Sequence, residues 1–292
     1  MSPSPFLDPF HPYELSQPIG KGEMGSVFQA RDIETGQVVA FKLLEQFDLR
    51  SKVDRGAVLE IIEFAARFKH PQLHPILKAM ESDEDNGKIA IAMPIASARS
   101  LADFLNAGKK IPAKHAINII IKLGGALEFL HKQDVAYGGV KPSNVLLDKD
   151  ANPTLTDLPM AHLREFGLLP AQPSVMQQYY LPPEVLYNSP PEIRGDIFSL
   201  GVLGYHLFKG TIPFDDPEPE ARHKLPESVG LPIMLYYVLL RAMTHRTEMR
   251  YPTVAAFLED LQGAMNGKID PNTLRWFKVK EEKPPDGDPP RR

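Results

Sequence analysis

The sequence predicts an α+β protein with two lobes, the first rich in β-strands and the second mainly helical. Three strand-like runs, at 13–19, 27–30 and 38–43, follow one another closely near the N-terminus. A long apolar helix is predicted over 113–132, where isoleucine and leucine recur at helical spacing. A chain of 292 residues suits one large domain or two modest lobes that share an interface.

Composition narrows the function classes. The chain has no cysteine, which excludes disulfides, thiol catalysis and cysteine zinc sites and fits a reducing compartment. A formal net charge of −4 without a basic block gives no reason to expect nucleic acid or an anionic membrane as a partner. No apolar run reaches transmembrane length and no signal peptide is visible. We therefore expect a cytoplasmic protein, with no membrane insertion from this chain.

A glycine-rich hairpin is predicted at the start of the strand-rich part. Gly20, Gly22 and Gly25 form a G-x-G-x-x-G pattern behind the first strand. Dinucleotide-binding folds also use this spacing, but a helix then begins directly after it. Here a second strand begins near Val27, and a turn follows at 34–37. The order favours a hairpin whose backbone can approach phosphates closely, because glycine has no Cβ.

The third predicted strand carries a candidate phosphate-binding lysine. Lys42 follows Ala40 in the run 38–43. A lysine here would place a point charge on phosphate oxygens, with its carbon stem along the sheet. An exposed strand lysine without a ligand is the alternative interpretation.

The stretch 137–144, with the sequence YGGVKPSN, lies between the long helix and another β-like run. It resembles the catalytic loop of the protein kinases, His-Arg-Asp-x-Lys-Pro-x-Asn. Lys141 and Asn144 match, whereas Tyr137, Gly138 and Gly139 stand in place of His, Arg and the catalytic Asp. With the hairpin and the Val-Ala-x-Lys strand, the chain over 13–263 resembles the protein kinase superfamily, of the bacterial Ser/Thr type.

The resemblance implies a two-lobed kinase-like fold over 13–265. The small lobe (13–96) would be an antiparallel sheet with one helix, and the large lobe (97–265) mainly helical. Residues 1–12 are interpreted as an irregular lead-in with Phe6 and Phe10 as anchors, and 266–292 as a mobile tail containing Trp276.

The resemblance also implies an ATP site between the lobes. In the hinge that follows Met93, the carbonyl of Pro94 and the N–H of Ala96 would contact the purine. The residues with an implied ATP-binding role are Gly20, Gly22, Gly25, Val27, Ala40, Lys42, Met93, Pro94, Ala96 and Leu146.

A helix is predicted over 54–69, and the family places on it a Glu that orients the strand lysine. The usual position holds Ile61. We expect Glu60 to be the partner of Lys42, with Glu63 as the alternative, because Phe64 would then lie on the same face in the family's regulatory spine.

Asn144 and Asp157 are the metal ligands that the resemblance implies, since both offer the hard oxygens that Mg²⁺ prefers. Asp157 opens Asp-Leu-Pro, which replaces Asp-Phe-Gly. Pro159 fixes φ and removes an N–H, so we expect this segment to be locked.

The activation segment, 161–180, lacks features of phosphorylation control. Gln177 stands at a usual Thr position, Ser174 is the remaining hydroxyl besides two tyrosines, and Gly138 replaces the Arg that grips a phosphate. In the large lobe, Asp196 is expected to hold the catalytic-loop backbone, and Arg250 to pair with Glu184.

These features together predict a pseudokinase: it binds ATP with Mg²⁺ as cofactors, has no intact catalytic base because of Gly139, and acts on an unknown protein partner as a scaffold or allosteric regulator. A slow or unconventional Ser/Thr kinase, or another ATP-dependent group transferase, is one alternative. A nucleotide-free interaction module is the other.

Overall fold

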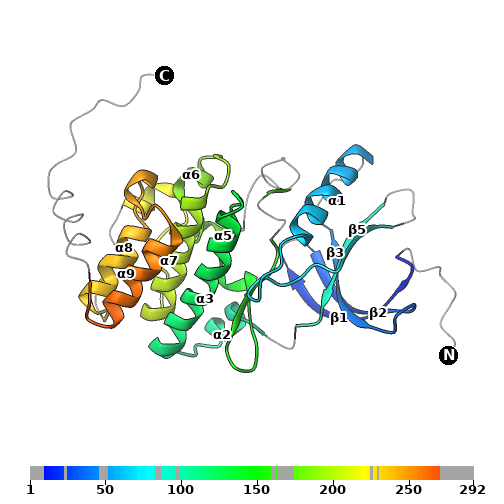
Figure 1. The fold of residues 1–292 in the computed structure, drawn as a ribbon, viewed down its shortest axis with the longest axis horizontal. Coiled ribbons are helices and arrows are strands. Elements are labelled where there is room, and N and C mark those ends of the chain that lie inside the picture. The colour runs from blue at the N-terminus through cyan, green and yellow to red at the C-terminus, as the bar shows by residue number, and fades with distance from the viewer. Residues whose placement is uncertain are drawn as a thin grey trace, which may run out of the picture.

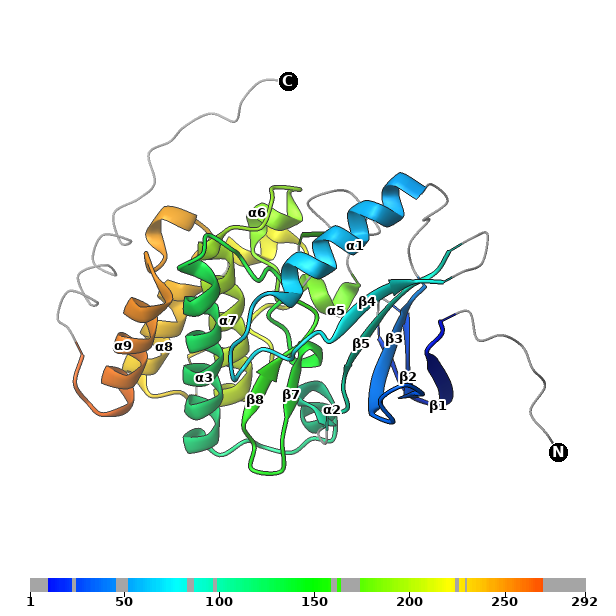
Figure 2. The same cartoon turned by 45° about the vertical axis from the view of Figure 1, so that its right-hand side comes forward.

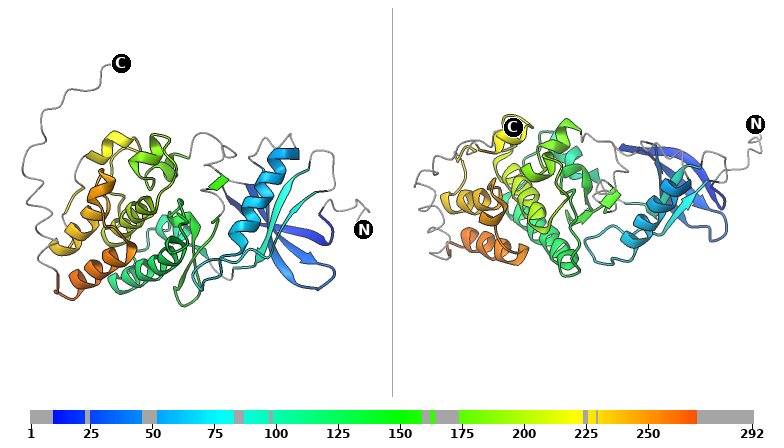
Figure 3. Two further views of the ribbon diagram at one scale, coloured as in Figure 1. Left: turned by 45° about the horizontal axis from the view of Figure 1, so that its top comes forward. Right: turned by 90° about the horizontal axis from the view of Figure 1, so that it is seen from above.

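The computed structural model describes residues 10–22, 25–45, 52–82, 87–96, 99–158, 162–163, 174–223, 226–228 and 230–269. These residues form two lobes arranged along the long axis of the molecule (Figure 1). Figure 3 shows them from two further directions, with the first strands at one end and the last helices at the other. Phe6, Trp276 and the rest of the predicted tail beyond 269 lie outside the described residues.

The small lobe is a five-stranded antiparallel sheet in the order β1-β2-β3-β5-β4, covered by one helix. This arrangement confirms the predicted sheet and helix of the first lobe. The elements are β1 (Tyr13–Gly22), β2 (Gly25–Asp32), β3 (Val38–Leu44), α1 (Lys52–Ala66), β4 (Lys78–Glu81) and β5 (Ile89–Pro94).

Aromatic packing ties the start of the described chain to the sheet. Phe41 on β3 is fully buried, and the rings of Phe10 and Tyr13 lie 5.1 and 5.5 Å from its ring. Burial of aromatic surface on this scale stabilises the lobe by about 2 kcal/mol per ring. Phe10 is therefore an anchor, as the sequence predicts.

The large lobe is built around two long helices, α3 and α7, which pack against each other and against α8 and α9 (Figure 1). Close approach of α7 and α8 depends on glycine: a Cβ on Gly201 would lie 2.8 Å from the Cβ of Ala242. The helices are α2 (Leu101–Asn106), α3 (Ala113–His131), α5 (Val175–Gln178), α6 (Pro183–Leu186), α7 (Ile193–Lys209), α8 (Ile233–Ala242) and α9 (Val254–Met265).

A three-stranded sheet of β6 (Arg99–Ser100), β7 (Val145–Leu147) and β8 (Pro153–Leu155) lies beside these helices. The connection from α1 to β4 passes over β8 (Figure 2). There Leu73 and Leu155 form a parallel bridge, and the N–H of His74 donates to the carbonyl of Leu155 at 2.7 Å. These bonds fix one side of the small lobe to the large lobe. No helix among the described residues combines the length and apolarity needed to span a membrane.

Candidate active site

The glycine-rich hairpin forms as the sequence predicts. Gly22 pairs with Gly25 at its tip, and Gly20 pairs with Val27. Gly25 has φ +142°, and a Cβ there would meet the carbonyl oxygen of Leu43 at 1.9 Å. Added Cβ atoms on Gly20 and Gly22 would make only ordinary contacts, at 3.9 Å. The pairing of β2 with β3 therefore requires glycine at position 25. At positions 20 and 22 the surrounding atoms leave room for a larger side chain.

Lys42 joins the two lobes through its side chain. Its ammonium lies 2.6 Å from Oδ1 of Asp157, which follows β8 in the large lobe. The lysine is buried and the carboxylate is 18% exposed. Asp157 has φ +64°, a backbone conformation that non-glycine residues rarely adopt. The structure thus brings together the lysine predicted to bind phosphate and the carboxylate predicted to bind a metal, which lie 115 residues apart.

The expected ion pair between Lys42 and Glu60 does not form. Glu60 and Glu63 both lie on the exposed side of α1, and the lysine pairs with Asp157 instead. Ile61 is buried at the position where the family has Glu. Phe64 is 39% exposed, so it does not lie in an internal spine.

The physical reason is the rotation of α1 about its axis. Its inward face is apolar, and the neighbouring carboxylates are turned toward solvent, because one residue along a helix rotates the side chain by about 100°. The buried residues of that face are Val58, Ile61, Ile62 and Ala65.

The hinge lies at the end of β5, where Met93 pairs with Ala40 and Pro94 with Val39. Met93 is buried, and Pro94 and Ala96 are half-buried. Leu146 is half-buried on β7, in register with Ser100 and Thr154. These positions border the junction of the lobes, as expected for a purine site.

His74 is a residue of the hinge region that the sequence did not single out. Its Nε2 lies 3.0 Å from the carbonyl oxygen of Pro94. Burial lowers the pKa of His74 below its ordinary value of 6.5, and the hydrogen bond to Pro94 and then the charge of Asp157 oppose this shift. The imidazole is therefore neutral at pH 7. Only the fold brings His74 to the hinge, since the two contacting residues are 20 positions apart.

The backbone of the catalytic loop is held by Asp196 at the start of α7. Its carboxylate accepts 2.7 Å hydrogen bonds from the N–H groups of Tyr137 and Gly138, and Nε2 of His131 lies 2.8 Å away. Gly138 has φ +64°, a conformation that favours glycine. The scaffold role expected of Asp196 is confirmed.

The position of the missing catalytic Asp is bordered by Tyr137 and Asn144. A Cβ on Gly139 would lie 3.3 Å from Nδ2 of Asn144 and 3.5 Å from Cε1 of Tyr137. The Tyr137 hydroxyl donates to the carbonyl of Thr156. Burial, followed by the charge of Asp157, raises the pKa of this phenol well above 10. Tyr137 therefore stays protonated and cannot accept a proton in place of the absent carboxylate.

Asn144 and Asp157 both act on the Tyr137 hydroxyl, the first through a hydrogen bond and the second through its charge. The Asn144 amide donates from Nδ2 to the carbonyl of Gly139 at 2.8 Å, which leaves its Oδ1 as the atom suited to a cation. In the part of the chain that the structure describes, no three His, Cys, Asp or Glu side chains are grouped as a metal site. The oxygen donors fit a Mg²⁺ ion that takes its remaining ligands from phosphate and water. Lys141, three residues before Asn144, is buried.

The described part of the activation segment is fixed by hydrogen bonds. The Ser174 hydroxyl accepts from the N–H of Gln177 and caps α5. Gln177 is buried, and Arg222 donates to the carbonyl of Gln178 at 2.7 Å. The predicted locking of the chain at Pro159 falls outside the described residues.

The predicted pair of Arg250 and Glu184 is present in a two-pronged geometry. The guanidinium donates to Oε1 at 2.6 Å and to Oε2 at 2.8 Å, and its Nε donates to the carbonyl of Thr244. Arg250 is buried and stacks over Phe198 at 4.8 Å. This pair links α6 to the core of the large lobe.

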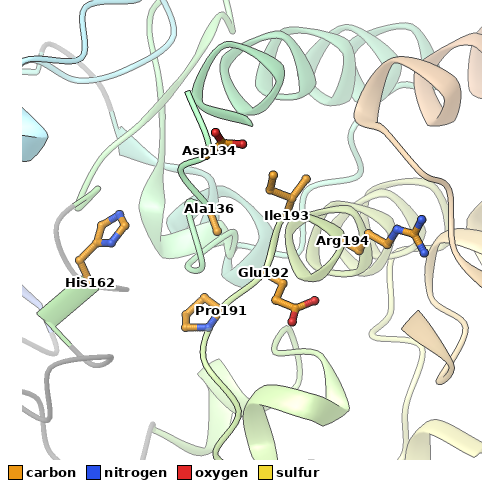
Figure 4. A pocket seen from close by; sticks show the side chains of 7 residues that line it. All are labelled: Asp134, Ala136, His162, Pro191, Glu192, Ile193 and Arg194. Atoms are coloured by element: carbon orange, nitrogen blue, oxygen red, sulfur yellow. The ribbon is translucent and has the colours of Figure 1, made fainter. Parts of the chain in front are cut away.

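A cavity of about 430 Å³ lies between the residues just before the catalytic loop and the start of α7 (Figure 4). It contains none of the residues of the predicted ATP site. Its lining residues are Asp134, Ala136, His162, Pro191, Glu192, Ile193 and Arg194.

Comparison with known proteins agrees with this geometry. The model of the protein kinase domain family matches residues 13–261. A probable serine/threonine-protein kinase of Clostridium perfringens is 27% identical over 282 residues, which are 92% of this chain and 40% of that protein. Aurora kinase of Schizosaccharomyces pombe is 29% identical over 252 residues, which are 82% of this chain and 68% of that protein.

Among solved structures, the PknI kinase domain of Mycobacterium tuberculosis has a TM-score of 0.71 at 24% identity, covering 87% of this chain and 97% of that one. The chain thus spans 40% of the clostridial relative but nearly all of an isolated kinase domain. A family model that covers most of the chain, together with the two-lobed structure, identifies it: the chain belongs to the protein kinase domain family.

Proposed function

We propose that this protein is a pseudokinase that binds ATP with Mg²⁺ between its lobes and regulates a protein partner. The observation that carries the proposal is that Gly139 has no side chain to accept a proton, and that the phenol of the neighbouring Tyr137 stays protonated. The Lys42–Asp157 pair supports nucleotide binding, because both groups lie where the lobes meet. A cytoplasmic location remains a prediction from the sequence.

The absence of the catalytic base determines how much slower phosphotransfer should be. General-base catalysis contributes on the order of 10² to 10⁴ in rate. Phosphoryl transfer depends mostly on positioning and electrostatics, so transfer is slowed rather than abolished when only the base is lost. Typical kinases turn over at roughly 1 to 100 per second. We expect at most about 1 per second here.

A slow Ser/Thr kinase is the second candidate. Lys42, Asn144 and Asp157 retain positions that can hold a metal–nucleotide complex. The similarity to kinases of C. perfringens and S. pombe also favours this function. A nucleotide-free interaction module is the third candidate, because Lys42 and the Pro94 carbonyl each already have a partner within the protein.

The nucleotide proposal is tested by thermal unfolding with ATP, with and without Mg²⁺. Binding at 100 times the dissociation constant stabilises a protein by about 2.7 kcal/mol. We expect stabilisation of the wild type that is lost in Lys42→Ala and kept in Lys78→Ala. Lys78 is the matched control, an exposed lysine on β4 of the same sheet. No stabilisation at millimolar ATP would favour the interaction module.

Phosphotransfer is tested separately with γ-labelled ATP and generic protein substrates. The pseudokinase proposal expects incorporation at least a hundredfold below ordinary kinase rates. Transfer at ordinary rates that disappears in Lys42→Ala would contradict it and establish the kinase alternative.

A further inference from the structure

Helix α5 carries the two most exposed large apolar side chains of the part of the chain that the structure describes. Val175 and Met176 are consecutive and are 63% and 57% exposed, whereas the next residue, Gln177, is buried. Tyr187, directly after α6, is 53% exposed. Exposed apolar side chains that gather in one place indicate an interaction surface, unlike single ones scattered over a protein.

An acidic loop, 215–220, is joined to α5 by the buried side chain of Arg222. The guanidinium donates to the carbonyl of Gln178 at 2.7 Å. It also donates to the carbonyls of Asp216 and Glu218, at 2.8 and 3.2 Å. Because one guanidinium contacts all three carbonyls, the loop and α5 form one surface. The exposed carboxylates of the loop are Asp215, Asp216, Glu218 and Glu220.

These carboxylates retain their charge for a binding partner. Arg222 bonds only to backbone carbonyls of the loop, and within the described residues none of the four carboxylates forms an ion pair. The Tyr187 hydroxyl donates to Oε1 of Glu220 at 3.0 Å, which adds the end of α6 to the same surface. An apolar centre is thus bordered by negative charge.

The surface is already formed in the protein without a partner. Ser174 caps α5 by accepting from the N–H of Gln177 at 3.3 Å, and the Tyr180 hydroxyl lies 2.6 Å from Nδ1 of His206. Arg222 stacks over the ring of Phe214 at 4.3 Å. Little backbone ordering is therefore needed on binding, which favours affinity.

We propose that α5, Tyr187 and the loop 215–220 dock a basic segment of a protein partner, one that presents an apolar side chain between its lysines or arginines. This inference rests on the proposed function, in which the protein acts on a protein partner, and it names the chemistry of that partner. The apolar side chain covers Val175 and Met176, and the cations face the carboxylates. An acidic segment is repelled, so charge supplies the specificity.

Fluorescence anisotropy with the full chain and three short synthetic peptides tests the docking. The first peptide has two leucines between arginines, the second has glutamates in place of the arginines, and the third has serines in place of the leucines. We expect the first to bind at least about tenfold more tightly than the other two. Its affinity should fall as salt is raised from about 50 to about 300 mM. Equal binding of the basic and acidic peptides, or no binding of the first, overturns the proposal.

Variants of the protein assign the binding to this surface. Val175→Ser combined with Met176→Ser should weaken binding of the first peptide about tenfold. Asp216→Asn combined with Glu218→Gln should weaken it about threefold and reduce its salt dependence. Asparagine keeps the Oδ1 that accepts from the N–H of Glu218 at 2.8 Å, so the loop keeps this bond. Ile233→Ser, at a side chain 54% exposed on α8, is the matched control and should bind as the wild type does.

Two further outcomes would overturn the inference. Wild-type affinity in both double variants would place the peptide elsewhere on the protein. A dimer in sedimentation analysis that is lost in the Val175→Ser and Met176→Ser variant would assign the surface to a second copy of this chain. Both outcomes leave stabilisation by ATP in place, whereas loss of that stabilisation with peptide binding retained contradicts only the nucleotide part of the proposed function.

Discussion

The ammonium of Lys42 lies 2.6 Å from the carboxylate of Asp157, and this contact directly connects the two lobes. Glu60, the partner expected on α1, is exposed, and the buried Ile61 occupies the position where the family has Glu. Lys42 therefore depends on the carboxylate that is also a proposed metal ligand. Substitution of Lys42 and substitution of Asp157 should therefore lower the free energy of unfolding by different amounts.

We expect Asp157→Asn to destabilise the ligand-free protein more than Lys42→Met, by about 2 kcal/mol. Asp157→Asn leaves a buried ammonium without a counter-ion, whereas Lys42→Met leaves a carboxylate that is partly exposed to water. Urea unfolding at pH 7 measures both free energies. An equal or larger loss for Lys42→Met would contradict this account of the pair.

Restoring a carboxylate at position 139 should not restore an ordinary kinase. The new Cβ lies 3.3 Å from Nδ2 of Asn144, so this amide must move by a few tenths of an ångström. We expect Gly139→Asp to raise phosphotransfer by less than about tenfold, because Tyr137, Gly138 and Gln177 also differ from the family pattern and the new carboxylate alone does not position the substrate. Gly139→Ala is the matched control, with the same Cβ and no carboxylate. A rate at least about a hundredfold above that of Gly139→Ala would refute this expectation.

The catalytic-loop backbone should loosen when Asp196 is changed. The buried carboxylate accepts from two N–H groups, and an Asn amide nitrogen would face one of these donors. We expect Asp196→Asn to cost about 3 kcal/mol and to lower Tm by roughly 6 to 12 °C. Asp150→Asn, at an exposed turn, should change Tm by less than about 2 °C. A wild-type Tm for Asp196→Asn would rule out this role.

The Arg250–Glu184 pair should not tolerate lysine. An ammonium cannot reproduce the two parallel bonds at 2.6 and 2.8 Å or the bond from Nε to Thr244. We expect Arg250→Lys to destabilise the protein by about 2 to 3 kcal/mol. A double-mutant cycle with Glu184→Gln should give a coupling energy of at least about 1.5 kcal/mol. Additive effects would show that the pair is not coupled.

Stability should fall as pH is lowered from 7 to 5.5. Burial lowers the pKa values of His70, His74 and His206 below 6.5, so the unfolded chain binds protons first. Each such histidine contributes up to about 1.4 kcal/mol per pH unit in this window, and the contribution is fully present above pH 6.5. Asp32 and Asp148, whose pKa values are lowered, lose their contributions only in more acidic solution.

Unfolding in urea at several pH values measures this slope. In His206→Asn the slope should be smaller, since the ring that pairs with the Tyr180 hydroxyl at 2.6 Å is gone. A slope unchanged by this substitution would assign the pH dependence to other groups.

The order of the motifs along the chain was enough to predict the two lobes, the glycine-rich hairpin, the absence of a carboxylate at Gly139 and the pairing of Arg250 with Glu184. These features follow from residue type and local pattern, because a strand, a turn or a missing side chain is a property of a few consecutive residues. The structure confirms the hairpin and the pair.

The partner of Lys42, the protonated phenol of Tyr137 and the imidazole of His74 at the hinge emerged only once the chain was folded. Each depends on contacts between residues distant in sequence and on the rotation of α1, where a single residue changes the direction of a side chain by about 100°. The local sequence pattern does not determine the rotation of a helix to within one residue. The packing of the elements against one another therefore decides whether these side chains face solvent, the core or the cleft.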